Sequence, residues 1–444
     1  MAWKKEKFKT LIEHKSGYTW SKEQETKFPE PKTVRVLTVT NVQKELDLSS
    51  ELYLKDVSEV DKVKKAVSKD WSIAVSSNGN RSRIGNAVYI QEDSEYLFAS
   101  FLTAFKPKED SDILPDYFFR WLTSHNIQER ITAVSEGTTG LGNLDIRFLR
   151  NTEIEYPENP AEQTAIATLL SKVDETIAAT QNSIKAAEKL KKALMQNLLT
   201  GKLKPDGSWR TDDEFYEDEK FGKVPLGWEV ARVKDYGFVQ TGKTPPTAEP
   251  NVFSETENEI RFPFITPGDL GVSKYISVSE RYVTEKGIGY SFKVPVNSVC
   301  VVCIGSTIGK IGITKIESCT NQQINTLIAN DNNSGEFFYY MMEYRKPHFK
   351  EIAGINATPQ INKSGFEKYK LLQPTSKVEQ EEIVLKIKST DEEFVAKQTK
   401  IQTLQRLKKS LMQNLLTGKV RLPQAFIAQF EKEVAEPSPI ETEN

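Results

Sequence analysis

One segment of this 444-residue chain occurs twice, almost unchanged. LKKALMQNLLTGK occupies residues 190–202 and LKKSLMQNLLTGK occupies residues 407–419, so that only Ala193 and Ser410 differ. The same spacing of 217 residues relates further positions upstream of both copies. Self-similarity at a constant offset indicates a duplicated structural unit. We therefore interpret the chain as a tandem duplication in which a variable globular half is followed each time by a nearly constant helix.

The repeated segments form the ends of two predicted long helices. Residues 162–200 contain no Pro or Gly, and apolar residues recur there at spacings of three, four and seven, as they do in the second copy. This spacing is typical of a coiled-coil seam. Gly201 and Gly418 follow the helices and suit a left-handed cap. The predicted helix-pairing or partner-binding seam consists of Ile166, Leu170, Val173, Ile177, Ile184, Leu194, Leu198, Ile383, Ile387, Phe394, Ile401, Leu411 and Leu415.

Two equal helices of about 60 Å could pair with each other. If a pseudo-twofold axis relates the two units, the helices run antiparallel. The alternative is that each apolar stripe packs against its own globular domain, but its recurrence after a second globular half favours pairing. The predicted regions are a first globular domain (1–157), a first helical region (158–204), an acidic linker (205–220), a second globular domain (221–374), a second helical region (375–422) and an acidic C-terminal tail (423–444).

The globular halves are predicted to mix short strands with a helix each. Aromatic residues at helical spacing predict one helix over 117–131 and another over 335–352. We assign these aromatics to the core rather than to a base-stacking surface. Alternating β-branched residues predict strands over 33–40, 72–76, 87–91, 298–304 and 311–316.

The charge of the chain is unevenly distributed. The formal net charge is −2, but residues 206–220 carry −5 and residues 431–444 carry −4, which leaves +7 on the remainder. A moderately basic body is compatible with DNA binding, although ordinary solvated surface charge would give the same balance. Three cysteines and the lack of an apolar run long enough to cross a membrane predict a cytoplasmic protein with no membrane partner.

Three stretches imitate catalytic motifs and fail on their spacing or context. Cys300 and Cys303 resemble half of a zinc site, but in a strand their side chains would point to opposite faces. GSTIGK at 305–310 is one residue too short between its glycines for a phosphate loop and is read as a turn between strands. Carboxylates of the acidic linker have no predicted strand to hold them for metal binding. We predict no catalytic residue and no metal site in this chain.

Polar turns in both halves carry the side chains that read DNA bases. Arg recognises guanine, and Asn or Gln recognises adenine, through paired hydrogen bonds in the major groove. For any single residue an ordinary turn or cap is the alternative, but the repetition of such turns favours DNA recognition. The predicted DNA-binding residues are Ser77, Asn78, Asn80, Arg81, Arg83, Thr138, Thr139, Asn143, Arg147, Lys243, Ser306, Thr307, Lys310, Gln322, Gln323, Asn325, Thr358, Gln360 and Lys363.

The motifs of the second half, together with the twin helices, resemble a known family over essentially the full chain. They are VPLGWE (224–229), TGKTP (241–245), IRFPFITPGDL (260–270), GSTIGKIGIT (305–314), NQQIN (321–325) and TPQINKSGFEKYKLLQP (358–374). This layout resembles the specificity (S) subunit of Type I restriction–modification enzymes. The first half departs from the pattern, because TTGLGN replaces TPQIN and its turn at 77–83 lacks GSTIGK.

The resemblance implies an α+β chain with two α/β target-recognition domains, separated by two long conserved helices that form an antiparallel coiled coil in a pseudo-twofold tandem duplication. It implies a non-catalytic reader of double-stranded DNA, in which each domain recognises one half of a bipartite asymmetric site. The helices would hold two methyltransferase (M) subunits, which bind S-adenosylmethionine and methylate adenine. With two restriction (R) subunits, which use ATP and Mg, the complex would cleave foreign DNA. No cofactor is expected on this chain.

Two other classes of function stay open at this point. One is a self-contained DNA methyltransferase or nuclease, which the missing motifs oppose. The other is a coiled-coil scaffold that binds only protein, which the duplicated Asn, Gln and Arg turns oppose.

Overall fold

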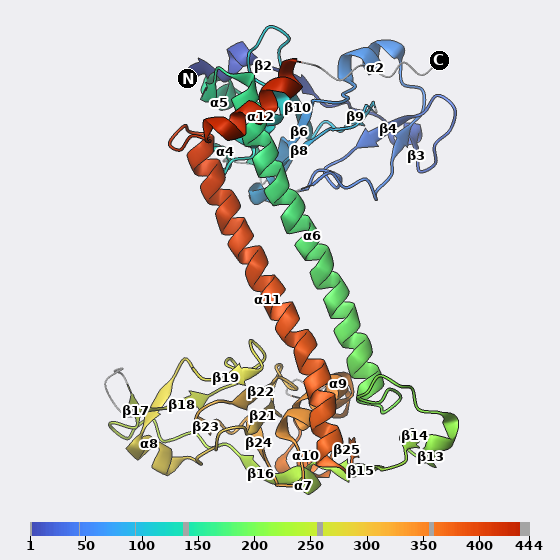
Figure 1. The fold of residues 1–444 in the computed structure, drawn as a ribbon, viewed down its shortest axis with the longest axis vertical. Coiled ribbons are helices and arrows are strands. Elements are labelled where there is room, and N and C mark those ends of the chain that lie inside the picture. Colours follow the sequence, from blue (N-terminus) through green and yellow to red (C-terminus); the bar gives the residue numbers. More distant parts are fainter. Residues whose placement is uncertain are drawn as a thin grey trace. The chain divides into compact units, whose positions relative to one another are not determined.

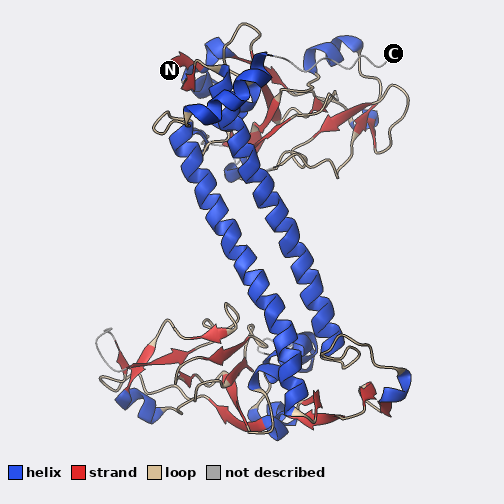
Figure 2. Cartoon of the chain, viewed as in Figure 1, coloured by secondary structure: helices blue, strands red, loops and turns tan. Residues whose placement is uncertain are grey.

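The computed structural model describes residues 2–43, 45–93, 95–135, 142–254, 261–354 and 359–435. It divides into two compact units (Figure 1). Unit 1 comprises residues 1–181 and 399–444, and unit 2 comprises residues 182–398. Each unit contains both helices and strands (Figure 2).

Two long helices, α6 (Pro160–Leu198) and α11 (Lys377–Leu415), contribute residues to both units. The other described elements of unit 1 are β1 (Trp3–Lys7), α1 (Phe8–Leu11), β2 (Ile12–Ser16), β3 (Glu25–Thr26), β4 (Val34–Leu37), β5 (Tyr53–Leu54), α2 (Glu59–Lys65), β6 (Ser72–Val75), β7 (Ser77–Asn78), β8 (Ala87–Tyr89), β9 (Leu97–Phe98), β10 (Leu102–Pro107), α3 (Pro115–Leu122), α4 (His125–Val134), β11 (Gly142–Asn143), α5 (Ile146–Asn151), β12 (Glu153–Pro157) and α12 (Gln424–Ala435).

Unit 2 has a corresponding series of elements. They are β13 (Phe215–Asp218), β14 (Gly222–Pro225), β15 (Trp228–Arg232), α7 (Val233–Tyr236), β16 (Gly237–Thr241), β17 (Phe253–Ser254), β18 (Arg261–Ile265), β19 (Tyr275–Ile276), β20 (Tyr282–Thr284), α8 (Glu285–Tyr290), β21 (Val299–Val302), β22 (Ile311–Thr314), β23 (Cys319–Thr320), β24 (Ile324–Ala329), α9 (Gly335–Ile352), α10 (Lys363–Lys368) and β25 (Lys370–Pro374).

The sheets of the two units have corresponding strand orders, and β19 adds a fifth strand to the main sheet of unit 2. The main sheet has the order β2-β10-β6-β8 in unit 1 and β16-β24-β21-β22-β19 in unit 2. A second sheet has the order β3-β5-β4-β9 in unit 1 and β17-β20-β18-β23 in unit 2. The strand pair beside the long helices also repeats, with Trp3 opposite Pro157 and Trp228 opposite Pro374. The predicted duplication is therefore confirmed at the level of strand order and register.

The predicted strands and one predicted helix are confirmed, whereas the other helix is wrong in one respect. Strands β4, β6, β8, β21 and β22 lie within the predicted ranges, and α9 covers 335–352. The single helix predicted over 117–131 is two helices, α3 and α4. Ser124 separates them because its backbone is extended, with φ −65° and ψ 145°. The aromatic residues end at Trp121, before the break, but the apolar Ile127 and Ile131 follow at a spacing of four and concealed it.

The long helices agree with the sequence. Both have 39 residues. Gly201 (φ 68°) and Gly418 (φ 67°) adopt the left-handed conformation after them, as predicted.

Within each unit the two helices run antiparallel. In unit 1 Arg421, just beyond α11, donates to Glu162 of α6, while Lys408 forms an ion pair with Asp174. The partner's number falls as the α6 number rises, so the directions are opposite. In unit 2 Lys191 of α6 forms an ion pair with Asp391 of α11, and Arg210, beyond α6, forms one with Glu379. The predicted antiparallel pairing is confirmed inside both units.

The predicted seam has two kinds of environment. Its members nearest the globular parts, such as Ile166, Leu170 and Ile383, are fully buried in the cores of their units. Central members, including Ile184 and Ile401, remain half-buried. The stripe therefore both pairs the helices and packs on the globular parts, so the two alternatives considered from the sequence hold together.

The linker and the tail contain structure that the sequence analysis missed. Strand β13 lies inside the linker, where no strand was predicted, and forms an antiparallel hairpin with β14 at the start of the predicted second globular domain. The tail begins with α12, whose Ile427 is 2% exposed and packs against Ala161 and Ala165 of α6. Acidic composition concealed both, because the apolar residues of these segments are few but correctly spaced for burial.

Candidate nucleic-acid interface

The polar turns predicted in unit 2 meet at one edge of its main sheet. Strand β16 ends, β24 begins, β21 ends and β22 begins at this edge, because neighbouring strands are antiparallel. The turn after β21 is held to the segment before α10 by two hydrogen bonds, from Gly305 N to Pro359 O (2.9 Å) and from Ile361 N to Cys303 O (2.8 Å). Cys303 N donates to Gln323 O at 2.8 Å. We call this surface, formed by residues 242–244, 303–310, 320–323 and 359–363, edge 2.

The equivalent turns of unit 1 meet in the same way. Ser76 N donates to Phe101 O (2.8 Å), and Leu144 N donates to Ser76 O (2.8 Å). Strands β7 and β11 pair beside them, with Ser77 opposite Asn143. We call this surface, formed by residues 76–86, 99–101 and 142–144, edge 1.

Matching hydrogen bonds identify equivalent positions on the two edges. The bond of Leu144 to Ser76 corresponds to the bond of Ile361 to Cys303. Asn143 in unit 1 therefore occupies the place of Gln360 in unit 2, at the 217-residue offset. Both side chains are exposed amides. The equivalence predicted between these two turns is confirmed.

The predicted residues of unit 1 differ in how available they are. Asn80, Arg81, Asn143 and Arg147 are exposed, and Ser77 and Asn78 are half-buried in β7. The predicted DNA-binding role of Arg83 is corrected. Its guanidinium donates to Val39 O (2.9 Å) and Val42 O (3.4 Å) and so holds a neighbouring loop. Thr138 and Thr139 lie outside the described residues, as does Thr358 of the second half.

In unit 2 most predicted residues line edge 2. Asn325 is the clear correction, because it is 3% exposed within β24 and accepts a hydrogen bond from Thr241 Oγ1 (2.7 Å). Its side chain is part of the sheet and cannot reach a base. Lys310 is half-buried and its ammonium donates to Pro267 O (3.3 Å). The exposed members are Lys243, Ser306, Gln322, Gln360 and Lys363, and Thr307 and Gln323 are half-buried.

Phe101 is a surface residue that the sequence analysis missed. It lies on edge 1 directly before β10, as Gln323 lies directly before β24 on edge 2. The carbonyl oxygen of each accepts the equivalent turn amide, from Ser76 or Cys303, at 2.8 Å. The Phe101 side chain is 53% exposed. Alignment of β10 with β24 places Phe101 at the position of Gln323. A single aromatic residue, however, cannot be distinguished from a core residue by sequence alone.

The thiols near edge 2 are structural. Cys300 packs with Val302 and Ile324, whereas Cys303 belongs to the other hydrophobic core of unit 2, so the predicted opposite orientation is confirmed. Burial raises the pKa of each of these two thiols to about 12. In the described ranges no cluster of three or more His, Cys, Asp or Glu side chains is arranged to hold a metal ion.

The family model described as the Type I restriction modification DNA specificity domain matches residues 2–189 and 225–406. This chain belongs to that family. The resemblance inferred from the motifs is confirmed, as is the predicted fold class of two mixed domains with two long helices. Within the described part of the chain, no helix has the length and apolar character needed to cross a membrane.

Two curated relatives cover the chain to different extents. The HindI specificity subunit of Haemophilus influenzae is 32% identical over 160 residues, which are 35% of this chain and 34% of that protein. This match thus spans about a third of the relative's length. The putative MjaX specificity subunit of Methanocaldococcus jannaschii is 23% identical over 430 residues, covering 95% of this chain and 94% of that protein.

Solved structures support the fold. The crystal structure of a Type I restriction–modification S subunit from M. genitalium aligns with a TM-score of 0.58 at 17% identity, covering 93% of this chain and 96% of that one. A chain from a structural study of assembly and conformational transition of the Type I system aligns with a TM-score of 0.52 at 13% identity, covering 93% and 97%.

Proposed function

We propose that this chain is the DNA sequence-recognition subunit of a Type I restriction–modification complex and reads a bipartite asymmetric site. The observation that carries the proposal is the correspondence of edge 1 and edge 2. Each edge has the same set of backbone hydrogen bonds, but the side chains at equivalent positions differ. Asn143 and Phe101 on edge 1 occupy the places of Gln360 and Gln323 on edge 2. Two surfaces with the same backbone structure and different side chains suit two different half-sites.

The exposed groups on the edges fit direct readout. An amide such as Gln360 can bond adenine through both of its polar atoms, and an aromatic such as Phe101 can contact a thymine methyl group. Lys243 and Lys363 on edge 2 suit phosphate contacts, which position a protein on the duplex without reading sequence.

The long helices are proposed to hold two M subunits. Their central seam is half-buried, and α11 also exposes Val378 (64%), Leu385 (65%) and Val395 (58%). Apolar side chains exposed along one helix suit a protein partner. We further propose that the M subunits bind S-adenosylmethionine, that two R subunits use ATP and Mg, and that this chain, in the cytoplasm, binds no cofactor and performs no catalysis.

Reconstitution tests the proposal. The purified chain with its M subunit should transfer methyl groups from labelled S-adenosylmethionine to adenines in one bipartite sequence, and the M subunit alone should lose this sequence preference. Turnover by the chain alone would favour the self-contained enzyme. A stable complex with M that methylates or binds DNA without sequence preference would favour a protein scaffold and overturn the proposed reader.

A further inference from the structure

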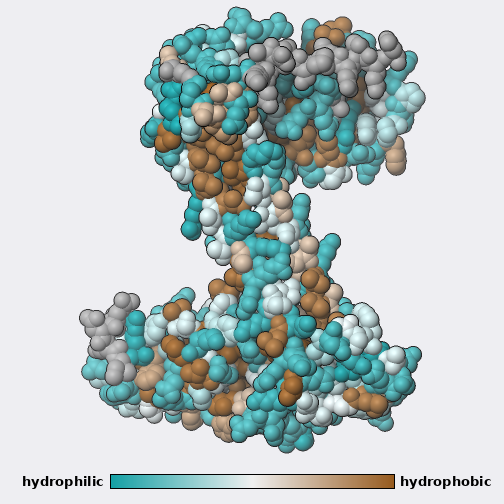
Figure 3. Space-filling model, in the orientation of Figure 1, coloured by the Kyte–Doolittle hydropathy of each residue, from teal (hydrophilic) through white to brown (hydrophobic). Residues whose placement is uncertain are grey.

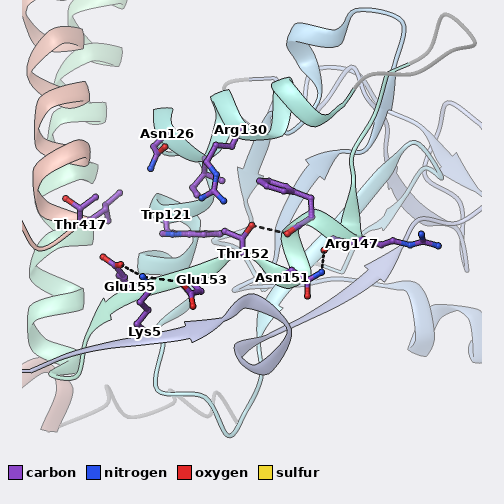
Figure 4. Close-up of a pocket in the computed structure, with 13 residues that line it drawn as sticks. Lys5, Trp121, Asn126, Arg130, Arg147, Asn151, Thr152, Glu153, Glu155 and Thr417 are labelled. Carbon is purple, nitrogen blue, oxygen red and sulfur yellow. Dashed lines mark hydrogen bonds and ion pairs between the residues drawn. The ribbon is translucent and has the colours of Figure 1, made fainter.

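Unit 1 contains an open cavity of 590 Å³ next to the end of α11 (Figure 4). Its walls come from β1, the α3–α4 elbow, the α5–β12 segment and the residues just after α11. Trp121, Ile127 and Leu416 form an apolar floor, each at most 5% exposed. A second cavity of 270 Å³ shares all three of these residues. We call the two together the unit 1 groove. Apolar residues also gather over the upper part of α11 in Figure 3.

The polar margin of the groove leaves positive charge available. Lys5 lies between Glu153 and Glu155, 3.1 Å from each, so these carboxylates already have a cation. Arg130 extends over the Phe148 ring at 5.1 Å. Among the described residues neither Arg130 nor Lys419 has a carboxylate within ion-pair distance. In Figure 4 Arg147 lies at the margin and points away from Trp121, so it contributes less.

In unit 2 the equivalent surface is covered by the chain's own linker hairpin. Phe221 packs on the core there, with the Arg345 guanidinium 5.8 Å from its ring centre. Arg345 in α9 corresponds to His125, which lines the unit 1 groove, because Leu114 N and Ser334 N donate to the equivalent Gln163 and Gln380 side chains. Backbone amides of Lys220 and Phe221 hold the pKa of Asp218 below its usual range.

One charge interaction and one contact agree with this placement of the hairpin. The nearby Lys370, which corresponds to the groove residue Glu153 at the 217-residue offset, also lowers the pKa of Asp218. Pro225 lies against Gly201 at the end of α6, the counterpart of Gly418 at the end of α11. An aromatic residue flanked by carboxylates therefore occupies in unit 2 the site that is open in unit 1.

The described segment that follows α11 does not take this place in unit 1. It turns into α12, which packs on the opposite element, against Ala161 and Ala165 near the start of α6. The groove consequently stays open in unit 1, with an apolar floor at its base and unpaired cations exposed at its margin, a combination that suits a partner segment.

We propose that the unit 1 groove docks a segment of the M subunit that presents an aromatic side chain beside carboxylates, as residues 215–225 do in unit 2. The aromatic ring would lie over Trp121 and Leu416, and its acidic neighbours would approach Arg130 and Lys419. Naming the M subunit as the source rests on the proposed function, whereas the chemistry of the segment follows from the internal counterpart.

The linker itself supplies the probe. A fluorescein-labelled peptide with the sequence of residues 212–226, DDEFYEDEKFGKVPL, is titrated against the full chain and followed by fluorescence anisotropy. We expect saturable binding with a Kd below about 1 mM, since the hairpin is not preformed in a free peptide. The same peptide carrying Phe221→Ala should bind much more weakly. No saturation, or equal affinity of both peptides, would overturn the groove proposal.

Substitutions in the full chain locate the binding site. Arg130→Glu should lower the affinity of the chain for the peptide about two- to tenfold at low salt, as expected for an exposed charge pair that becomes repulsive. Asn126→Trp should abolish binding by filling the groove. Arg150→Glu, an exposed arginine of α5 outside the groove, is the control and should leave affinity and the circular dichroism spectrum unchanged. Unchanged binding by Asn126→Trp would overturn the assignment to this groove.

Competition identifies the occupant. Unlabelled M subunit should displace the peptide from the wild-type chain. A complex of chain and M that still binds the peptide would overturn M as the source, while the methylation assay reports independently on DNA recognition. Binding that appears only after residues 436–444 are deleted would assign the groove to this chain's own tail and overturn the partner proposal.

Discussion

Lys408 of α11 lies 2.5 Å from Asp174 of α6, and the duplication repeats this ion pair with the helices exchanged, as Lys191 with Asp391. Each residue of the first pair has its counterpart 217 positions away in the second. The duplication therefore repeats the same contact between the long helices inside each unit. The aspartates also anchor the globular parts, because Asp174 accepts from Arg120 (2.6 Å) and Asp391 from Tyr340 (2.7 Å).

Asp174→Asn should therefore destabilise unit 1 more than Lys408→Met does. The asparagine leaves the Arg120 guanidinium, which is 8% exposed, without its nearest carboxylate, at a cost of about 1–3 kcal/mol. Loss of the partly exposed lysine should cost less than about 1 kcal/mol. Urea unfolding of both variants measures the difference, and equal effects would show that Asp174 does not anchor Arg120.

Phe101→Ala should weaken recognition of one half-site only. Loss of a specific contact to a base pair costs about 1–3 kcal/mol, or roughly five- to a hundredfold in affinity. Phe28→Ala is the matched control, because Phe28 is also exposed (74%) but lies outside edge 1. Binding of the complex with M to duplexes mutated in each half-site measures the effect. The same loss from both substitutions would remove Phe101 from the interface.

The domain order and the two long helices could be predicted from the sequence because both occur twice. The offset of 217 residues relates Gln163 to Gln380, and both side chains are fully buried with their carboxamide nitrogens bonded to Pro157 O and Pro374 O. Helices of 39 residues repeat their apolar spacing often enough to be predicted by periodicity alone.

The site was less predictable because exposure depends on tertiary pairing. Asn325 and Gln323 are two residues apart in one polar run, yet only Asn325 is covered, by the neighbouring strand β16 that carries Thr241. Likewise Arg83 was predicted to read bases, but its guanidinium donates a hydrogen bond to Val39 O, in a loop more than 40 residues away in the sequence. Residue type and turn context cannot distinguish these cases.

The three cysteines should resist alkylation in the folded chain. Burial raises the pKa of each thiol, including Cys319, to about 12, so the reactive thiolate at pH 8 should be depleted about a thousandfold or more relative to a free cysteine. The raised pKa values also predict that the folded chain loses stability as pH rises above about 8.5, because the unfolded chain then releases thiol protons that the folded chain retains. Iodoacetamide labelling with and without guanidinium tests this, and rapid labelling of the native chain would contradict it.

Lengthening both long helices together should change only the gap between the half-sites. Four residues inserted between Gln181 and Asn182, and four more between Gln398 and Thr399, preserve the ion pairs within each unit. Each insertion adds about 6 Å. We expect both half-sites unchanged and a gap one or two base pairs longer, by methylome sequencing. An insertion in α6 alone should instead destabilise the pairing of the helices. An unchanged gap after the double insertion would refute the helices as the spacer.

Exchange of one globular domain tests the central claim most directly. Residues 221–374 of this chain would be replaced by the corresponding domain of another specificity subunit, and the methylome of a strain carrying the chimaera and its M subunit would be sequenced. Two independent readers predict that the half-site read by unit 2 changes while the other half-site stays identical. A simultaneous change of both half-sites, or of neither, would contradict a chain in which each unit reads its own half of the DNA.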